Sequence, residues 1–359
     1  NTVQGSSGGF EMAPSQSQQV QHDHVPDTTD ARRNIALGDQ YSTACQPSHG
    51  VLSHTSTPVR RGGGLPSENR PITRPPAPTP MGATRSRTSA RPGGGVWAGF
   101  LAPSPSKRWT ELFFLAYSPV WITWVLFILV PFKLYEGLGE WGYMAIGLAA
   151  ALPVFLLPPL LQPKHEAGKP WVQRYWVKAN IWIAIFSFVG NYVWTHYFYQ
   201  VLGAAYTFKA HELNGVPITL YFMTHAYFAL YHALANVLIR KARSMVGPRS
   251  PNLRILAEAV VVFVLAYSTA YAETLTISHF PYYTHKDKER MYTVGSLFYA
   301  IYFFVSFPMF FSMDEDPKAK PYTLWKVVVD SLAACMLVTL LLDFWRLAVT
   351  AQPGLPWLA

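Results

Sequence analysis

The chain has 359 residues, of which 50% are hydrophobic and 15% aromatic but only 14% charged. This composition excludes an ordinary soluble protein and is typical of an integral membrane protein with several spans. The formal net charge of +9 does not indicate nucleic-acid binding, because the basic residues of membrane proteins gather in loops on the cytoplasmic side. With only two cysteines, a disulfide framework and a thiolate metal cluster are also excluded.

The first part of the chain differs in composition from the rest. Residues 1–96 are rich in Ser, Gln, Pro, Gly and Arg and lack clustered aromatic residues. Such a segment cannot bury enough apolar surface to fold. We therefore predict a disordered amino-terminal tail over 1–96 and a membrane-embedded domain over 97–359.

The second part predicts an all-α, polytopic bundle of about seven transmembrane helices, since apolar segments long enough to cross a bilayer recur along it. They lie near 111–134, 142–162, 177–200, 217–239, 255–277, 292–312 and 324–346. The second segment contains Pro153, Pro158 and Pro159, which predict kinks relieved by neighbouring helices, or a broken or re-entrant helix. Basic residues are densest between Arg240 and Arg254, and their distribution predicts a cytosolic amino terminus.

Polar side chains interrupt the third segment. Asn191 and His196 lie among Trp194, Tyr197 and other aromatic residues. Polar groups at membrane depth are costly unless they face the protein interior, so this helix has either a packing face or a ligand-binding face. The simpler interpretation is a belt of Trp and Tyr at the lipid headgroups with a hydrogen-bonded histidine behind it.

The fourth segment places His225, His232 and Asn236 at spacings of seven and four, which puts all three on one helical face. We expect this polar stripe to face the bundle interior, with His232 as a structural partner of Asn236. Carboxyl groups also occur inside the fifth and seventh segments, at Glu273 and Asp343. Ionisable groups within a membrane span are candidate functional residues.

Helix direction suggests that some of these groups lie at one depth. His196, Glu273 and Asp343 each fall about four residues, or about 6 Å, before the end of their segments, which run the same way. Two simpler interpretations remain open: Asp343 forms a local ion pair with Arg346, and Glu273 is a solvated carboxylate at the membrane interface.

The HExxH motif and the glycine-rich nucleotide loops are absent from the sequence. A metal held by the three membrane histidines is less favoured, because no two of them stand at i and i+4. Acid and base chemistry on an apolar substrate remains. A receptor for lipids and a proton-coupled transporter are the alternatives, although a transporter predicts repeated halves that we do not find.

Several long segments resemble one known family. They are ANIWIAIFSFVGNYVWTHYFYQVLGAAYTF, THAYFALYHALAN, AYAETLTISHFPYY, LFYAIYFFVSFPMFFSMDE and DSLAACMLVTLLLDFWRL, in this order from Leu101 onward. This part of the chain resembles the cycloeucalenol cycloisomerases of plants and green algae. The resemblance implies an enzyme of the endoplasmic reticulum membrane that opens the 9β,19-cyclopropane ring of cycloeucalenol without a redox cofactor and gives the Δ8 sterol obtusifoliol.

That reaction requires an acid that protonates C19 and a base that removes a proton from C8, beside a cation at C9. A buried glutamic acid that keeps its proton is a natural donor, so Glu273 is our first candidate, with a histidine as tuning group, base or rival donor. Aromatic rings can stabilise the cation by about 2 kcal/mol when desolvated. The candidate catalytic residues are Glu273, His196, His225 and Asp343, and the candidate sterol-binding residues are Asn191, Trp194, Tyr197, His232 and Tyr271. We expect no metal, no cofactor, a sterol substrate and contact with membrane lipid.

Overall fold

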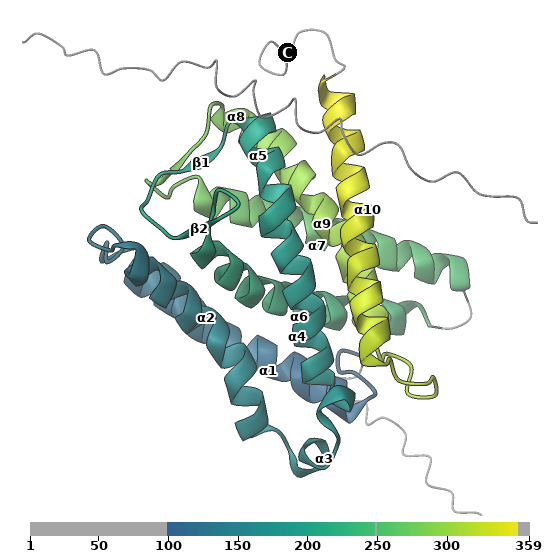
Figure 1. Ribbon diagram of the computed structural model, residues 1–359. Coiled ribbons are helices and arrows are strands. Elements are labelled where there is room, and N and C mark those ends of the chain that lie inside the picture. Colours follow the sequence, from purple (N-terminus) through teal and green to yellow (C-terminus); the bar gives the residue numbers. More distant parts are fainter. Residues whose placement is uncertain (1–98, 248–249, 351–359) are drawn as a thin grey trace, which may run out of the picture. The chain divides into compact units, whose positions relative to one another are not determined.

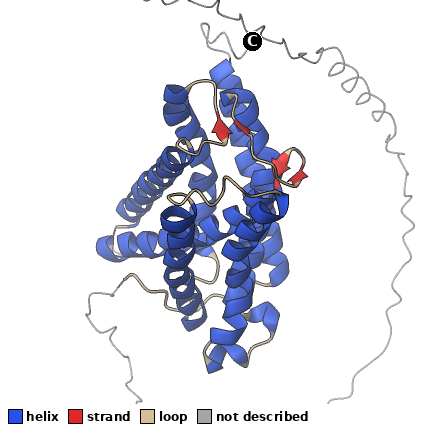
Figure 2. Ribbon diagram, turned by 90° about the vertical axis from the view of Figure 1, so that its left-hand side faces the viewer, coloured by secondary structure: helices blue, strands red, loops and turns tan. Residues whose placement is uncertain are grey.

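A computed structural model describes residues 99–247 and 250–350. The predicted tail 1–96 and the start of the predicted domain at Trp97 lie outside the described residues. The described part is a helical bundle with two short two-stranded sheets at the helix ends (Figures 1 and 2). The predicted all-α class is confirmed.

The principal helices follow the apolar segments of the sequence. They are α1 (Pro105–Ile122), α2 (Glu140–Leu161), α4 (Tyr175–Val189), α5 (Thr195–Leu202), α6 (Ile218–Val246), α7 (Pro251–Ile277), α9 (Ser296–Ser312) and α10 (Leu324–Thr350). Short helices or helical turns connect or extend them: η2 (Thr123–Leu129), α3 (Lys164–Ala167), η3 (Trp171–Gln173), η4 (Gly190–Trp194), α8 (Lys288–Arg290) and η5 (Met291–Gly295). The strands are β1 (Ala205–Tyr206), β2 (Glu212–Leu213), β3 (Val216–Pro217) and β4 (Tyr283–Thr284).

Six helices among the described residues are long and apolar enough to cross a membrane, and they match six of the seven predicted spans. The predicted span 177–200 is helical, running through α4, η4 and α5, but it is not among the six. Its polar residues, including Asn180 and Asn191, make it less apolar than the others. Because α4 packs against α6 and α10, these residues are enclosed by neighbouring helices (Figure 1).

Helix α2 is continuous despite its three prolines, so it is neither broken nor re-entrant. A proline lacks the N–H that would bond the carbonyl four residues earlier. The carbonyl opposite Pro153 belongs to Ala149, and it accepts a hydrogen bond of 3.3 Å from the Tyr117 hydroxyl. The carbonyl opposite Pro158 belongs to Val154, and it accepts one of 3.3 Å from the Asn180 amide. Neighbouring helices thus satisfy the carbonyls that Pro153 and Pro158 leave free, as the sequence predicted for these two prolines.

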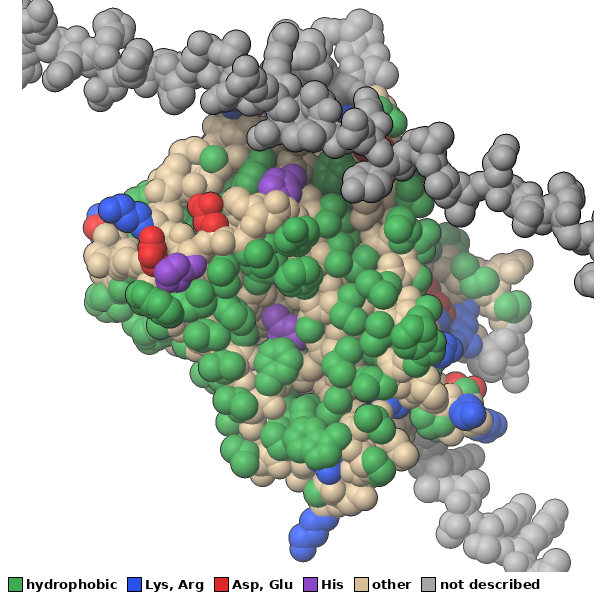
Figure 3. All heavy atoms as spheres, viewed as in Figure 1, with side chains coloured by type: hydrophobic (Ala, Val, Ile, Leu, Met, Phe, Trp, Pro, Cys, Tyr) green, Lys and Arg blue, Asp and Glu red, His purple; other side chains and the backbone are tan. Residues whose placement is uncertain are grey.

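Aromatic side chains fill the centre of the bundle. The buried face of α9 contributes Phe298, Tyr302, Phe303, Phe307 and Phe310, which pack against rings of α4, η4, α5 and α6. Small residues of α6, among them Ala229 and Ala233, let the neighbouring helices approach closely. The outer surface is largely apolar, and Figure 3 shows that charged side chains lie mainly towards its edges. This distribution is typical of a protein surrounded by lipid.

Candidate active site

Glu273 on α7 is held by two tyrosines from two other helices. The Tyr231 hydroxyl on α6 donates a hydrogen bond of 3.1 Å to Oε2 of Glu273, and the Tyr299 hydroxyl on α9 donates one of 2.9 Å to the same oxygen. Among the described residues, Oε1 of Glu273 has no hydrogen-bond donor. The carboxyl group therefore has one oxygen fixed by protein and a second oxygen available for proton exchange with a ligand.

The surroundings of this carboxyl group are aromatic. Tyr231 and Tyr299 both pack edge-on against Phe303, with ring centroids 5.6 and 5.2 Å apart. Tyr299 also contacts Tyr302 at 4.9 Å and Phe198 at 5.9 Å. The faces of such rings attract cations. The sequence analysis missed Tyr231 and Tyr299, because no local motif links them to Glu273; the tyrosine content of the fourth and sixth spans was the available signal.

Glu273 and the two histidines of α6 differ in how much of each side chain is exposed. Glu273, Tyr231 and Tyr299 are half-buried, so part of each side chain can be reached by a small molecule. His225 and His232 are 4% and 0% exposed. Reaching either histidine requires unpacking of the core, whereas Glu273 and its two tyrosines keep part of their surface exposed.

His225 has a structural role in this arrangement. Its Nε2 lies 2.9 Å from Oδ1 of Asn180, whose amide group bonds the Val154 carbonyl that Pro158 leaves free. The imidazole ring also stacks on Phe155 at 4.4 Å. His225 therefore orients Asn180, which bonds the carbonyl that Pro158 leaves free in α2. His225 forms no hydrogen bond or ring contact with Glu273, Tyr231 or Tyr299.

His232 lies inside a cage of aromatic rings. Its Nδ1 bonds the Phe228 carbonyl at 2.8 Å, and Nε2 is buried without a hydrogen-bond partner among the described residues. The rings of Trp182, Phe307 and Phe310 surround it at about 5 Å. The expected pairing of His232 with Asn236 is wrong, because the Asn236 amide donates instead to Oε1 of Glu111 at 2.8 Å. The predicted burial of the polar stripe is confirmed.

His196 and Asp343 belong to a second polar site, which lies on the surface. They line a shallow surface depression with Tyr197, Gln200 and Arg346, and Glu273 does not contribute to its lining. Asp343 accepts hydrogen bonds of 3.0 and 2.7 Å from Arg346, which confirms the local ion pair considered above. Nε2 of His196 lies 3.0 Å from Nδ2 of Asn214. The structure thus joins two members of the expected layer and leaves Glu273 apart from them.

The remaining candidate residues are distributed around the bundle. Asn191 is buried and bonds the Ser187 carbonyl of its own helix at 2.9 Å. Trp194 is fully buried and donates to the Thr339 hydroxyl at 2.9 Å, so its ring belongs to the core. Tyr197 packs against Phe298, with ring centroids 5.8 Å apart. Tyr271 is 41% exposed on the outer side of α7 and stacks on Tyr267.

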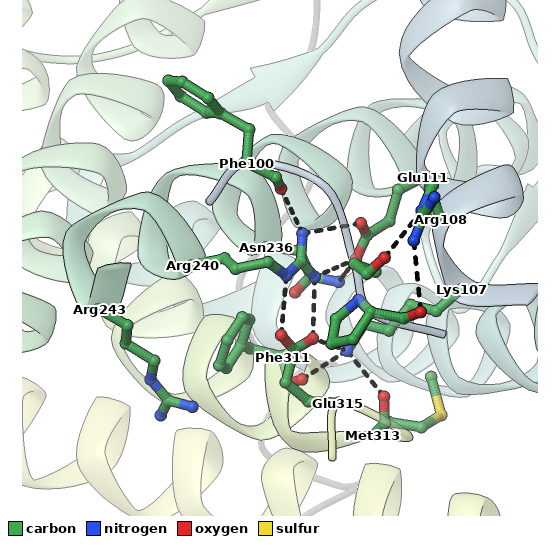
Figure 4. Close-up of polar contacts among 12 residues, drawn as sticks. Phe100, Lys107, Arg108, Glu111, Asn236, Arg240, Arg243, Phe311, Met313 and Glu315 are labelled. Carbon is green, nitrogen blue, oxygen red and sulfur yellow. Dashed lines mark hydrogen bonds and ion pairs between the residues drawn. The ribbon is translucent and has the colours of Figure 1, made fainter. Parts of the chain in front are cut away.

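A buried ionic cluster, formed by Lys107, Glu111, Asn236, Arg240 and Glu315, was not anticipated from the sequence (Figure 4). Arg240 bonds both oxygens of Glu111 and both oxygens of Glu315, at 2.7 to 3.0 Å. Lys107 bonds the carbonyls of Phe311 and Met313 and pairs with Glu315 at 2.9 Å. The cluster ties α1 and α6 to the segment after α9, and we interpret it as structural because its charges are paired.

Comparison with known proteins identifies a relative of this chain. An Arabidopsis thaliana protein described as cycloeucalenol cycloisomerase is 49% identical over 269 residues, which cover 72% of this chain and 96% of the relative. No family model matches the chain. No solved structure matches it either.

The fold and the site together define a helical membrane protein with a tyrosine-bound carboxyl group in an aromatic, apolar surrounding. The extent and level of identity with the Arabidopsis protein define its family. The chain belongs to the cycloeucalenol cycloisomerase family.

Proposed function

We propose that this protein is a sterol isomerase that opens the 9β,19-cyclopropane ring of cycloeucalenol and forms the Δ8 sterol obtusifoliol. Family membership supports the reaction, and the Glu273 site is the single structural observation that carries the assignment of the acid. The reaction is an isomerisation, so protons are moved while no net oxidation or reduction occurs.

In the proposed first step the protonated carboxyl group of Glu273 donates its proton from Oε1 to C19. The C9–C19 bond breaks, its electron pair forms the new C19–H bond, and positive charge develops at C9. Tyr231 and Tyr299 continue to donate to Oε2 and stabilise the carboxylate that remains. The ring of Phe198, which is half-buried and packs against Tyr299, provides a negative face for the cation.

In the second step a base removes the C8 proton, and the C8–H electron pair forms the C8=C9 double bond. The Glu273 carboxylate is a base already located beside the cation, and accepting this proton restores the starting acid. His225 is committed to Asn180 and His196 to the surface depression. We therefore assign both proton transfers to Glu273 and neither to these histidines.

The cellular location of the protein can also be inferred. The six apolar helices make it a membrane protein. We infer that it resides in the endoplasmic reticulum and that residues 97–359 form its catalytic domain, since a sterol is taken from and returned to the lipid phase. Fluorescence of a tagged full-length chain, compared with a reticulum marker, tests the location.

The experiment that tests the function is incubation of membranes containing the full chain with cycloeucalenol in deuterated water, followed by mass spectrometry of the sterols. The expected product is a Δ8 sterol with one deuterium in its C19 methyl group, because the proton that Glu273 takes from C8 exchanges with solvent before the next turnover. Unchanged substrate in the presence of folded protein contradicts the proposal and favours a binding or transport role.

A further inference from the structure

The two-stranded sheet β1–β4 carries a pair of tyrosines beside the Glu273 site. Tyr206 and Tyr283 are direct partners in this antiparallel sheet, and their ring centroids lie 4.9 Å apart. Tyr283 is only 8% exposed, and Tyr206 is half-buried. Neither hydroxyl forms a hydrogen bond with another described residue, and neither oxygen is among the fully buried atoms that lack a partner. Both hydroxyls therefore have accessible surface, through which they can donate a hydrogen bond to a bound molecule.

The pair is connected to Glu273 through packed aromatic rings. Tyr206 and Tyr283 belong to one small apolar cluster that also contains Phe198. Phe198 in turn packs edge-on against Tyr299, the tyrosine that donates to Glu273. Burial raises the pKa of both Tyr206 and Tyr283 above the ordinary value, and neighbouring tyrosines raise it further. Both phenols therefore stay protonated and able to donate.

Depth in the membrane gives an independent argument. β1 follows α5 and β4 follows α7, so the sheet lies where these two helices end. Glu273 precedes the end of α7 at Ile277 by four residues, or about 6 Å along the helix. A sterol in a bilayer keeps its ring A hydroxyl at the polar interface and its hydrocarbon portion below. With the hydroxyl at the sheet, the cyclopropane ring lies deeper, towards Glu273.

We propose that Tyr206 and Tyr283 bind the 3-hydroxyl group of the sterol substrate and thereby position its cyclopropane ring at Glu273. This inference rests on the proposed function. It assigns a specificity role to a loop sheet: substrates with a free hydroxyl at C3 are preferred to sterols in which this group is removed or blocked.

The test uses Tyr206→Phe, Tyr283→Phe and the double variant in the full chain, with cycloeucalenol and its 3-deoxy analogue as substrates. Each single change removes one hydrogen bond, so we expect KM for cycloeucalenol to rise about 3- to 10-fold while kcat changes less. The double variant should lose most of the wild-type preference for the hydroxylated sterol. Tyr192→Phe is the matched control, since Tyr192 is 40% exposed and lies in η4, outside the β1–β4 sheet, so the same change there should leave KM unaltered.

The outcomes separate the two proposals. If the wild type does not convert cycloeucalenol, the proposed function fails. If it converts both substrates with the same KM, or if the folded double variant keeps the full preference for the hydroxylated sterol, only the hydroxyl assignment is overturned. The wild-type comparison of the two substrates needs no variant, so it decides the question even where a substitution prevents folding.

Discussion

At the scale of single residues, the contacts of Glu273 distinguish it from the other polar groups in the spans. The amide of Asn180 and the imidazole of His225 satisfy one another and the carbonyl freed by Pro158. Asp343 is paired with Arg346. Glu273 bonds only neutral phenols, and one of its oxygens has no donor among the described residues. This is the arrangement expected of an acid that must gain and lose a proton.

The hydroxyl groups of Tyr231 and Tyr299 should each contribute to turnover. Tyr231→Phe and Tyr299→Phe each remove a donor to the carboxylate that forms in the first step, and a hydrogen bond to a charged group contributes about 1.5 to 3 kcal/mol. We expect kcat to fall about tenfold or more for each variant, with sterol binding retained. Steady-state kinetics on purified protein provide the measurement.

Tyr302→Phe is the control for these variants. Tyr302 packs against Tyr299, but its hydroxyl does not bond Glu273. An equal loss of kcat in this control would show that the phenols act through packing, and unchanged kcat in Tyr231→Phe and Tyr299→Phe would remove them from the mechanism.

At the scale of elements, sequence periodicity predicted the helices and the inward polar face of α6, because both depend on local spacing. The partners of that face could not be predicted. Asn236 bonds Glu111 and His225 bonds Asn180, and these contacts depend on how α1 and α4 pack against α6. Glu273 was identified because a carboxyl group within an apolar span is conspicuous in sequence, whereas Tyr231 and Tyr299 reach it only through tertiary packing.

Glu315, in the segment between α9 and α10, should make the stability of the protein depend on pH. Burial alone raises the pKa of Glu315, but the hydrogen bond from Arg240 and the charge of Lys107 outweigh it, so the pKa lies below its ordinary value. Ionised Glu315 therefore stabilises the fold above the unfolded-state pKa of about 4.3, and this stabilisation is lost as the pH falls through the folded-state value. The wild type should unfold at a higher temperature than Glu315→Gln at neutral pH. The gap between the two unfolding temperatures should narrow as the pH falls.

Thermal unfolding in detergent across this pH range measures the gap. Asp316→Asn, in the same segment, is the control and should keep the acid dependence of the wild type, because the Asp316 carboxylate accepts a hydrogen bond from the backbone N–H of Lys318 and forms no ion pair with a described residue. A gap for Glu315→Gln that stays constant as the pH falls would contradict the assigned role of the ionic cluster.

At the scale of the whole molecule, the described helices confirm the predicted membrane bundle, and the central position of α4 explains why one predicted span is less apolar than the others. Span boundaries are properties of the sequence, so the order and approximate extent of the helices could be predicted. The positions of His196 and Asp343 relative to Glu273 could not, since equal depth along parallel helices does not decide which side of a helix meets which neighbour.

The topology leads to a prediction for the intact protein. We expect the connection between α6 and α7 to be cytosolic, because basic residues are densest between Arg240 and Arg254, and the β2–β3 turn at Asn214 should then lie on the opposite side of the membrane. A glycosylation acceptor with flexible flanks, inserted at this turn, should be modified when the full chain is expressed in cells. The same acceptor inserted after Gly247 should remain unmodified, and the reverse pattern would contradict the orientation.

The central claim is that Glu273 transfers the proton, and the turnover of Glu273→Gln measured beside the wild type tests it most directly. Glutamine keeps the shape of the side chain and its contacts with Tyr231 and Tyr299 but cannot act as the acid. The account predicts a folded protein that binds cycloeucalenol and converts it about 100-fold more slowly or less, the scale on which a general acid contributes. Turnover close to that of the wild type would contradict the assignment of Glu273.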